Sequence, residues 1–593
     1  MIQEIIKQLI GKAIQELQEE GKLESAQIEQ IPLEHPEEEG RGDYATAVAL
    51  QLAKQLAKNP REIADFIVSK LEIQHSKLLD KIELAGPGFI NLYISKGYLL
   101  SELARVFKEG DDFGKSASLK EKKVMIEFTD PNPFKEFHIG HLYTNTVGES
   151  LSRILETNGA NIKRANYQGD VGMHVAKAIW GMMSPNDEEK RPINGTLSEK
   201  IKYMAGAYAL GHVSYITDGK MGVVTEGRIR KEIEGINKSI YGRSNNEVNK
   251  LYDWGRKASL RYFEQIYKRL GTKFDFYYFE SEVGKAGIKL VQENLKKGVF
   301  EKSEGAVIFP GEKFGLHNRV FINSQGLPTY EAKELGLAPT KYKDFRYDLS
   351  IVITGNEVSD YFKVLLVALK QINPELAGKT KHIGHGMVRL PEGKMSSRTG
   401  NVITAEELLE EVKKRARVIA GSSGSEITDK EKEEILEMVT VGAVKYAFLR
   451  VGIGKDLIFD FEKSLSLEGD SGPYLQYTYA RCRSILRKAQ KIRNSKFEIR
   501  NSAELSKEEL DILRWVYRFP EVAQEAGEKF SPNLVCNFVF ELAQRYNHFY
   551  NTHSVLQAES DEQKQFRLLL TSATAQTVKS SLNLLGIKVP ERM

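Results

Sequence analysis

Residues 121–168 alternate strand, turn, helix and strand, and this order restricts the fold more than any other feature of the chain. EKKVMIEF ends in an apolar run typical of a short strand, and TDPNP (129–133) is rich in turn-forming residues. HIGHLYTNTVGESLSRILETNG then has apolar side chains at helical spacing, with Gly159 as its stop. Because NIKRANYQGD supplies another strand, we predict a βαβ unit within a parallel, doubly wound α/β sheet.

A chain of 593 residues is long enough for several domains around this unit. Residues 1–115 combine two helical stretches with a strand pair around KIELAGPGFINLYIS, which predicts a small N-terminal α+β domain. The sheet domain is expected at 116–420, interrupted by a polar, mostly helical insertion at about 186–250. After the insertion, we expect AVIFP, RVFINSQGLPTY and DLSIVITGNE to resume the sheet.

The remainder of the chain is predicted to be helical. GSSGS (421–425) marks a linker, and the pair Thr428 and Glu431 has the spacing of a capping box at a helix start. We therefore expect a connecting region at 421–465 and an all-α helical bundle at 466–593.

Composition excludes several classes of protein. No apolar run approaches the length that spans a bilayer, and the amphipathic first helix lacks a cleavage site, so neither a membrane partner nor a signal peptide is expected. The two cysteines, Cys482 and Cys536, lie far apart, which excludes a disulfide framework and a Cys-x-x-Cys zinc site and suits a cytoplasmic location. A net charge of +4 does not by itself indicate a nucleic-acid partner.

The tetrapeptide HIGH occurs twice, at 138–141 and at 382–385. The first copy begins a helix after a strand, where backbone N–H groups and the helix dipole favour an anion. His138 and His141 share one helix face, and Gly140 lets a ligand approach the backbone. The tetrapeptide alone does not distinguish a phosphate site from a histidine pair that only begins a helix. The second copy precedes the β-leaning GMVRL, so we expect His382 and His385 to be structural or supporting residues.

A second element, LPEGKMSSRTGNVIT (390–404), is basic and rich in Gly and Ser. Lys394 and Arg398 flank its Met-Ser-Ser core, and such a loop can stabilise the charge of a reacting phosphate. Taken in isolation, it would be an ordinary solvent-exposed loop.

The two elements, in this order, resemble the HIGH and KMSKS signatures of class I aminoacyl-tRNA synthetases. The stretch from IEFTDPNP to YQGDVGMHV is similar to the arginyl-tRNA synthetases over about fifty residues. GDYAT, AKNPREIA and AGPGFINLYI in the first domain, and YLQYTYARCRSILRKA and LNLLGIKVPERM near the end, resemble the same family. The resemblance covers nearly the whole chain and is weakest at 186–250.

This resemblance implies an arginine–tRNA ligase with a Rossmann-like catalytic domain. Arginine and ATP would give arginyl-adenylate and pyrophosphate, and the terminal ribose of an arginine-specific tRNA would then take the arginine. His138, His141 and Lys394 would be the catalytic residues, with Mg²⁺ accompanying ATP, no zinc and no protein-held metal. The implied ATP-binding residues are Gly140, His138, His141, Lys394, Met395, Ser396 and Arg398. Ser397 stands where the signature has a second lysine, so Arg398 supplies that charge.

The arginine pocket should contain carboxylates, since a guanidinium is bound best by planar acceptors. The resemblance places Glu127, Asn132, Tyr330, Glu334 and Asn356 there. Tyr330 and Glu334 are one helical turn apart, and Glu334 stands where the family usually has aspartate. Glu357 is the alternative to Asn356. Without the family, Glu127 would be a solvent-facing strand end and Tyr330 a core aromatic.

A neighbouring segment, YQGDVGMH, also resembles the family core. It places Gln168, Asp170 and His174 near the site, although a loop stabilised by Asp170 explains the segment equally well.

Residues 481–500 hold eight Lys and Arg against one acid, Glu498, which favours a strip that follows phosphates. A solvated helix face is the alternative for the basic residues, and an ordinary core is the alternative for the aromatic ones. The predicted tRNA-binding residues are Tyr474, Gln476, Tyr477, Arg481, Arg483, Tyr546 and Tyr550. The resemblance also implies that the first domain contacts the outer corner of the tRNA, and that the protein is a monomer.

Two alternatives remain at this point. One is a class I synthetase for another amino acid, such as cysteine or glutamate; the absent zinc cysteines count against cysteine. The other is a catalytically silent tRNA-binding relative, against which the intact His138, His141 and Lys394 argue.

Overall fold

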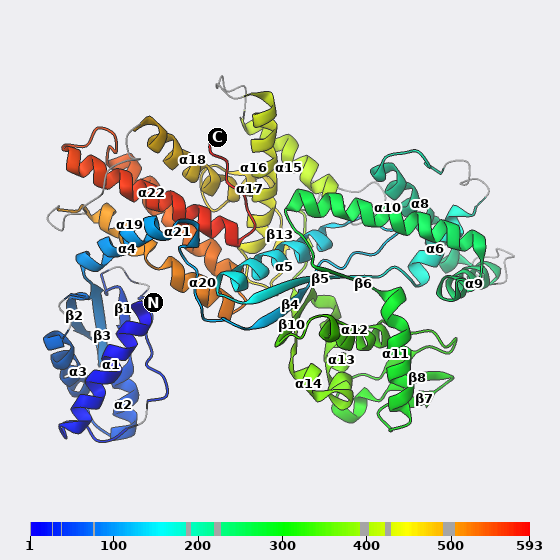
Figure 1. The fold of residues 1–593 in the computed structure, drawn as a ribbon, viewed down its shortest axis with the longest axis horizontal. Helices are drawn as coiled ribbons and strands as arrows, with labels where there is room; N and C mark the ends of the chain where they lie inside the picture. The colour runs from blue at the N-terminus through cyan, green and yellow to red at the C-terminus, as the bar shows by residue number, and fades with distance from the viewer. Residues whose placement is uncertain are drawn as a thin grey trace.

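A parallel five-stranded sheet forms the centre of the computed structural model (Figure 1). The structure describes residues 2–26, 28–36, 38, 40–74, 77–184, 191–218, 227–391, 403–420, 428–489 and 504–593. In order, the strands of the sheet are β11 (Thr380–His385), β10 (Leu349–Gly355), β4 (Lys123–Glu127), β5 (Asn161–Gln168) and β6 (Phe276–Phe279). The strand order reverses between β4 and β10, and open α/β sheets bind ligands at such a switch point. The predicted doubly wound α/β fold is confirmed.

Helix α5 (Ile139–Thr157) joins β4 to β5 and lies between the sheet and the C-terminal helices (Figure 1). Apart from Gly140 and Arg153, every residue from Ile139 to Leu155 is buried. A helix buried on all sides must pack against neighbours along its whole length. The helices α16 (Asp429–Leu449), α20 (Phe519–Glu528) and α22 (Asp561–Leu584) contact it on the side away from the sheet.

One expectation for the sheet was wrong: AVIFP and RVFIN do not join it. They form β8 (Ala306–Phe309) and β9 (Arg319–Ile322) of a separate antiparallel sheet with β7 (Glu301–Ser303). The two residues between β7 and β8, Glu304 and Gly305, have φ of 47° and 81°, as a tight hairpin turn requires. This local hairpin pairing takes the strands out of reach of the parallel sheet, which resumes only with β10.

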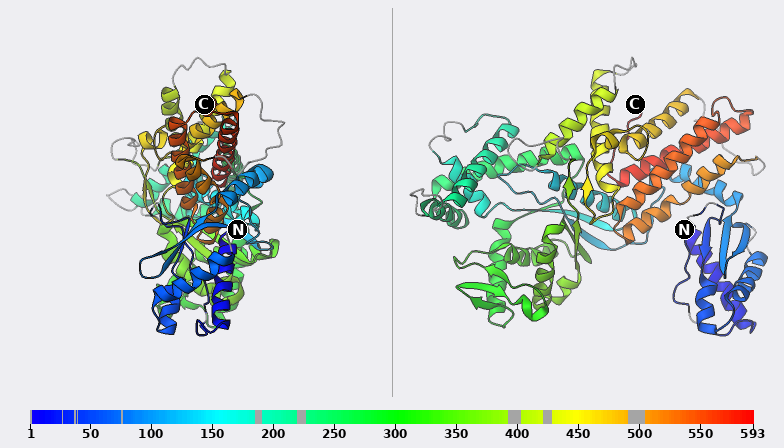
Figure 2. Two further views of the ribbon diagram at one scale, coloured as in Figure 1. Left: turned by 90° about the vertical axis from the view of Figure 1, so that its left-hand side faces the viewer. Right: turned by 180° about the vertical axis from the view of Figure 1, so that it is seen from behind.

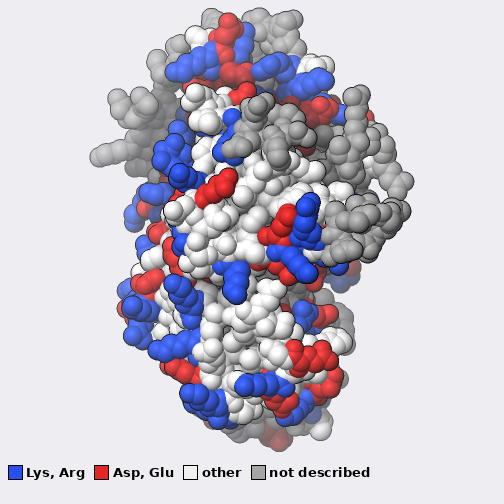
Figure 3. Space-filling model, turned by 90° about the vertical axis from the view of Figure 1, so that its right-hand side faces the viewer, with Lys and Arg blue, Asp and Glu red and all other residues white. Residues whose placement is uncertain are grey.

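Helices also surround the two sheets. Those next to the antiparallel sheet and β10 are α11 (Glu280–Leu295), α12 (Tyr330–Asp344), α13 (Ser359–Ile372), α14 (Pro374–Gly378) and the 3₁₀ turns η2 (Gly311–Phe314) and η3 (Asn356–Val358). The inserted helices, at the right of Figure 1, are α6 (Met173–Met182), α8 (Leu197–Thr217), α9 (Arg228–Gly242) and α10 (Asn246–Leu270). On the face that they present, an uncharged strip runs down the middle while Lys and Arg gather mainly along one edge (Figure 3).

The N-terminal domain stands at one end of the molecule (Figures 1 and 2). Its antiparallel sheet has the order β1–β3–β2, and its elements are α1 (Ile2–Glu19), β1 (Tyr44–Thr46), α2 (Val48–Leu56), α3 (Pro60–Gln74), β2 (Leu79–Ala85) and β3 (Phe89–Ile94). It is tied to α20 through Glu521, which accepts hydrogen bonds from the Tyr44 hydroxyl (2.7 Å) and lies 3.1 Å from Nε2 of His35. Helix α4 (Lys96–Glu109), which is followed by the 3₁₀ turn η1 (Gly110–Asp112), packs on α22 and α19 (Lys507–Val516).

The C-terminal part is helical, as expected. Besides α16, α19, α20 and α22 it contains α15 (Ala405–Ala420), α17 (Phe461–Leu465), α18 (Gly472–Lys488) and α21 (Pro532–Thr552). A short parallel pair, β12 (Val388–Arg389) and β13 (Leu457–Ile458), connects this part to the sheet domain. Among the helices that the structure describes, none combines the length and apolarity needed to cross a membrane.

Close packing of α6 on α8 generates a stability prediction. A methyl group at Gly211 of α8 would lie 2.1 Å from the carbonyl oxygen of Lys177 in α6. Gly211→Ala should therefore cost about 1–3 kcal/mol and lower the melting temperature. Gly206→Ala, in the same helix but with open space around it, should be neutral or stabilise by about 0.5–1 kcal/mol. Calorimetry of both variants checks this, and equal melting temperatures would contradict the close helix crossing.

Candidate active site

A cavity of about 730 Å³ opens at the carboxyl ends of β4, β5 and β10. It brings together residues from distant parts of the chain that the sequence had singled out. Nine of them line it: Glu127, Asn132, His138, Gly140, His141, Tyr330, Glu334, Glu357 and His385. The cavity therefore joins the helix start proposed for ATP to the residues proposed for arginine.

The loop after β4 enters the cavity in a strained conformation. Thr129, Asp130 and Phe134 all have positive φ, of 81°, 43° and 69°. For a β-branched residue such as Thr129 this is rare, and strain of this kind gathers at functional sites. Hydrogen bonds hold the loop in place: the Tyr167 amide donates to Asp130 (2.8 Å), and the Phe134 amide donates to Ser259 (3.0 Å).

Asn132 of the same loop is packed against Gly169. A Cβ at position 169 would lie 2.3 Å from Oδ1 of Asn132, so only glycine leaves room for this amide beside the cavity. Gly169 follows β5, so the close approach fixes the loop against the next strand of the sheet.

The first HIGH copy is a helix cap as well as a candidate ligand site. Nδ1 of His138 accepts hydrogen bonds from the amides of Gly140 (3.1 Å) and His141 (3.4 Å), and Nδ1 of His141 accepts one from the His138 amide (3.3 Å). The two rings stack with centroids 3.6 Å apart. Because both Nδ1 atoms accept, the ring proton of each histidine resides on Nε2, which has no hydrogen-bond partner among the described residues.

Burial keeps both histidines neutral. It lowers the pKa of His138 to about 4 and that of His141 well below its ordinary value, and the charge of Lys135 acts in the same direction. At neutral pH the pair therefore presents two N–H donors at a helix N-terminus. This arrangement suits an anionic ligand and does not rely on imidazolium charge.

Carboxylates outnumber cations in the cavity. Glu127 pairs with Lys341 (2.5 Å), and Glu280 pairs with Lys333 (2.6 Å). The carboxylate of Glu334 has no hydrogen bond or ion pair with any residue that the structure describes. Burial, reinforced by the charge of Glu127, raises the pKa of Glu334 well above its usual range. Burial and Glu127 raise the pKa of Asp130 in the same way. A guanidinium would supply the missing positive charge.

Tyr330 is exposed (58%) at the start of α12, so the alternative of a core aromatic is wrong. Glu127, in contrast, is buried and paired, which excludes the alternative of a solvent-facing strand end. Asn356 is not among the residues lining the cavity, whereas its neighbour Glu357 is. The position left open between these two residues is therefore better matched by Glu357.

The second HIGH copy forms β11, the strand at the edge of the sheet. Nε2 of His382 lies 2.8 Å from Oγ1 of Thr354, and its ring stacks on Phe362 with centroids 4.0 Å apart. His385 lines the cavity, with Nε2 2.7 Å from Oγ1 of Thr144 on α5. Both histidines thus support the site from the adjacent strand, and His385 contacts the helix that the first copy begins.

The predicted phosphate loop residues Lys394, Met395, Ser396 and Arg398 lie outside the described residues. The residues on the C-terminal side of this segment are hydrogen-bonded beside the cavity. Ile403 accepts a backbone hydrogen bond from Ile139 (3.0 Å), and Ala405 donates one to Phe137 (2.8 Å). The chain that follows the loop is therefore bonded directly to the start of α5.

Asp170 fits the structural interpretation of its segment. Its buried carboxylate accepts hydrogen bonds from Arg256 (2.8 Å), Tyr252 (3.0 Å) and both donors of Ser281. His174 is buried nearby, with Nε2 2.8 Å from the carbonyl oxygen of Gly169. Gln168 is buried and donates to Asn166 (2.6 Å). Neither Asp170, His174 nor Gln168 is among the cavity-lining residues.

Two predictions on tRNA contacts were wrong, because the side chains are fully buried. Gln476 donates to the carbonyl oxygens of Met438 (3.0 Å) and Lys588 (2.7 Å), and Tyr546 donates to Thr571 (3.2 Å). These residues hold helices together and cannot touch RNA directly. The sequence around Gln476 and Tyr546 is polar and aromatic, and such a sequence does not show whether a side chain is buried between helices or exposed to RNA.

The other candidate tRNA residues gather on α18 and α21. Arg481 lies between the rings of Tyr477 and Tyr550, 4.9 Å from each centroid. Asn547 joins it to Tyr474, accepting from Arg481 (2.6 Å) and donating to Tyr474 (2.9 Å). Arg483 is held by Glu591 (2.8 Å). The basic strip beyond residue 489 falls in 490–503, outside the described residues.

Sequence reasoning missed three acids that line the cavity, Asp130, Glu280 and Glu331, its lining cation Arg319, and the two buried lysines, Lys333 and Lys341, that pair with its acids. Glu280 directly follows β6 at the same edge of the sheet as Glu127, so its strand-end position was a usable signal. Lys333 and Lys341 lie within α12 and carry no such signal, because buried helix lysines are identified only by their partners.

The buried histidines predict a pH dependence. Burial lowers the pKa of His174 to about 3. Below about pH 6.5 this imidazole is protonated in the unfolded chain but stays neutral in the folded chain. The free energy of unfolding therefore falls as pH falls. His174→Gln keeps a donor to Gly169 without titrating. Between pH 7.5 and pH 5 the variant should lose about 2 kcal/mol less stability than the native chain. Urea unfolding at both pH values measures the difference, and equal losses would contradict it.

Comparisons with known proteins identify the family of the chain. Three family profiles match: "Arginyl tRNA synthetase N terminal domain" (residues 4–94), "tRNA synthetases class I (R), catalytic domain" (102–461) and "DALR anticodon binding domain" (475–593). The arginine–tRNA ligase of Flavobacterium psychrophilum is 32% identical with full coverage of both chains. That of Clostridium kluyveri is 32% identical over 98% of this chain and 99% of its own.

Solved structures share the fold. The arginyl-tRNA synthetase of Thermus thermophilus superposes with a TM-score of 0.78 at 24% identity, with full coverage of both chains. That of Plasmodium falciparum gives a TM-score of 0.76 at 20% identity, covering 100% of this chain and 99% of its own. The resemblance expected from the motifs is thus confirmed. With one profile across more than half of its length and relatives at 32% identity along all of it, the chain belongs to the arginyl-tRNA synthetases, the class I arginine–tRNA ligases.

Proposed function

We propose that the cavity between β4, β5 and β10 is the place where arginine and ATP react. The observation that carries this proposal is the pairing of two opposite preferences in one cavity of about 730 Å³. A helix N-terminus with two neutral N–H donors favours phosphate. The carboxylates of Glu334 and Asp130, which line the same cavity and form no ion pair with any described residue, favour a guanidinium.

In the first step, the arginine carboxylate attacks the α-phosphorus of ATP, and the bond to the β-phosphate breaks to release pyrophosphate. Nε2–H of His138 and of His141 would donate to the phosphates, and Gly140 would leave room for the nucleotide. Glu334 would pair with the guanidinium, helped by the ring of Tyr330, while Glu127, Asn132 and Glu357 would complete the pocket. The protein needs no covalent nucleophile, so its contribution is positioning and charge stabilisation.

In the second step, a ribose hydroxyl at the end of the tRNA attacks the activated carbonyl, and the bond to AMP breaks. The C-terminal bundle would bind the anticodon through Tyr474, Tyr477, Arg481 and Tyr550. Arg481, stacked between two tyrosines, supports this assignment, since unpaired bases stack on aromatic and guanidinium planes. The region 1–115 would contact the outer corner of the tRNA, with 116–420 catalytic, 421–465 connecting and 466–593 binding the anticodon.

Mg²⁺ would enter with ATP and neutralise its phosphates. Among the described residues, no three His, Cys, Asp or Glu side chains form a group that could hold a metal, so the donor set suits an ion carried mainly by the phosphates. Lys394, Met395, Ser396 and Arg398, as the family resemblance implies, would contribute to stabilising the phosphates. We further propose a cytoplasmic monomer without zinc.

Pyrophosphate exchange tests the proposed reaction. Each of the twenty amino acids is incubated with ATP, labelled pyrophosphate and the protein, with and without tRNA. Exchange with arginine alone among them is expected, and the family resemblance implies that tRNA is required. Exchange with a different amino acid would favour another synthetase specificity, and no exchange under either condition would indicate a silent relative.

Glu334 should set the affinity for arginine. Glu334→Gln removes the negative charge and should raise KM for arginine about tenfold or more, because hydrogen bonds to charged groups contribute about 1.5–3 kcal/mol. Glu334→Asp keeps the charge and serves as the matched control. Since the pKa of Glu334 is raised in the empty cavity, arginine binding releases a proton. KM for arginine in the native chain should therefore fall as pH rises, and in Glu334→Gln this dependence should be weaker.

A KM for arginine that Glu334→Gln leaves unchanged would remove Glu334 from the pocket. The KM for ATP, measured in parallel, shows whether any change is confined to the amino-acid side of the cavity.

A further inference from the structure

A side chain from α5 bonds directly to the strained residue Thr129. Thr129 lines the cavity at the start of the loop that carries Asp130 and Asn132, and its φ of 81° costs about 1–3 kcal/mol. Nδ2 of Asn145 donates to Oγ1 of Thr129 at 3.0 Å, between two buried residues. A buried hydrogen bond to a strained residue favours the conformation that makes the bond possible.

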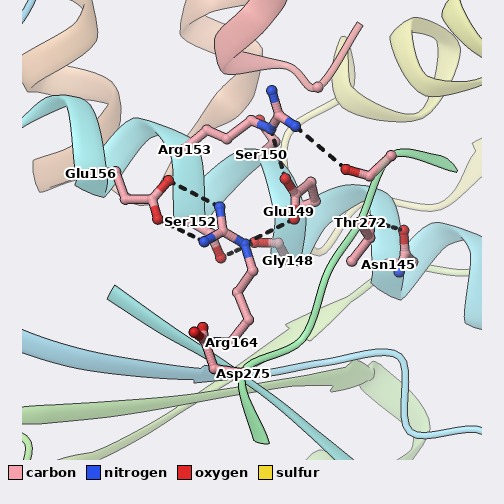
Figure 4. Close-up of polar contacts among 12 residues, drawn as sticks. Asn145, Gly148, Glu149, Ser150, Ser152, Arg153, Glu156, Arg164, Thr272 and Asp275 are labelled. Carbon is pink, nitrogen blue, oxygen red and sulfur yellow. Dashed lines mark hydrogen bonds and ion pairs between the residues drawn. The ribbon is translucent and has the colours of Figure 1, made fainter. Parts of the chain in front are cut away.

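Asn145 uses the other end of its amide as well. Oδ1 accepts a hydrogen bond from Oγ1 of Thr272 at 2.9 Å (Figure 4), and Asn145 has no exposed surface. Thr272 follows Gly271, which ends α10 with φ of 74°. The amide of Asn145 thus bridges the substrate loop on one side and the turn after α10 on the other.

The same turn is attached to the C-terminal bundle. Nζ of Lys445, on α16, donates to the carbonyl oxygens of Leu270 (2.6 Å) and Gly586 (2.9 Å), and Lys445 is 1% exposed. Gly586 lies just beyond α22, and a Cβ there would approach Nζ of Lys445 to 3.0 Å. Lys445 therefore fastens the end of the last helix to the turn that Asn145 contacts.

Neighbouring contacts fix α5 in the same region. Glu149 accepts from Nε of Arg153 (2.7 Å) and from Nε of Arg164 on β5 (2.9 Å), as Figure 4 shows. Arg153 reaches Asn583 on α22 (2.8 Å), and Ser150 donates to the carbonyl oxygen of Leu584 (3.0 Å). The end of α22 is thus docked on α5 one to two turns beyond Asn145.

We propose that Asn145 is a positioning residue for the arginine-binding loop, and that the docked end of the C-terminal bundle holds it in place through Lys445 and the Leu270–Thr272 turn. The chain of contacts runs from Gly586 through Lys445 to Leu270, and from Thr272 through Asn145 to Thr129. The inference rests on the proposed function only in that the loop at 129–132 binds arginine. His138 and His141 start α5 itself, so the ATP side of the cavity depends less on this chain.

Substitutions at Thr272 test the positioning role. Thr272→Val keeps the shape but removes the donor to Asn145, whereas Thr272→Ser keeps the hydroxyl and is the matched control. In arginine-dependent pyrophosphate exchange by the full chain with tRNA, Thr272→Val should raise KM for arginine about tenfold and change KM for ATP less than twofold. Thr272→Ser should restore the native KM within about twofold.

The outcomes separate positioning from plain stabilisation. A structural role alone would reduce the active fraction, so kcat would fall while both KM values stayed constant, and this result would overturn the proposal. Equal rises in both KM values would overturn it too. The proposed function fails separately, because the native chain itself would then show no exchange with arginine.

A double-mutant cycle tests the link to the bundle. Lys445→Met removes the donor to Leu270 and Gly586, while Lys588→Met removes a lysine from the same interface and is the control. In the Lys445→Met background, the effect of Thr272→Val on KM for arginine should shrink from about tenfold to less than threefold. An undiminished effect would overturn the role of the bundle, and Lys588→Met should leave that effect intact. Thermal melting of each variant verifies that the chain is folded.

Discussion

The burial of α5 is the constraint on which the rest of the structure depends. A helix whose side chains are buried from Ile139 to Leu155 must be covered by the sheet on one side and by other helices on the opposite side. Gly148 is part of this fit, because a Cβ there would lie 2.1 Å from the ring of Phe128, which leads into the substrate loop. The same helix therefore fixes the HIGH pair at its start, the strained loop beside it and the docking of the C-terminal bundle.

Charge in the cavity follows from this burial. Ion pairs such as Glu127 with Lys341 are made at the sheet edge, where desolvation makes an unpaired charge costly. Glu334 and Asp130 form no ion pair with any described residue, and burial together with the charge of Glu127 raises the pKa of both. A cation bound beside these two carboxyl groups would offset that desolvation cost, as the proposed guanidinium would. Neutral His138 and His141 serve the opposite need, since their N–H groups suit an anion without adding fixed charge.

Local patterns predicted the centre of the fold well. The βαβ unit could be predicted because strand, turn and helix signals agree at 121–168, and the HIGH pair could be placed because a strand precedes it and a helix follows. The antiparallel sheet could not be predicted, because β8 and β9 have the same apolar composition as strands of a parallel sheet. Gln476 and Tyr546 were misplaced for a related reason: burial in a helix bundle is decided by neighbouring helices, and composition does not report it. Lys341 and Asn145 depend on contacts with residues far away in the sequence, which no local spacing encodes.

The docking of α22 on α5 also affects the order in which the chain can fold while it is being synthesised. Ser150 and Leu584, which are hydrogen-bonded, are separated by 434 positions in the chain. At synthesis rates of about 5–20 residues per second, roughly 20–90 s pass between the appearance of these two residues. During that interval the strands and α5 can assemble, but the bundle side of α5 is covered only in stages, as α16, α20 and finally α22 are synthesised. A nascent chain at this stage leaves in contact with water apolar side chains of α5 that the finished protein buries.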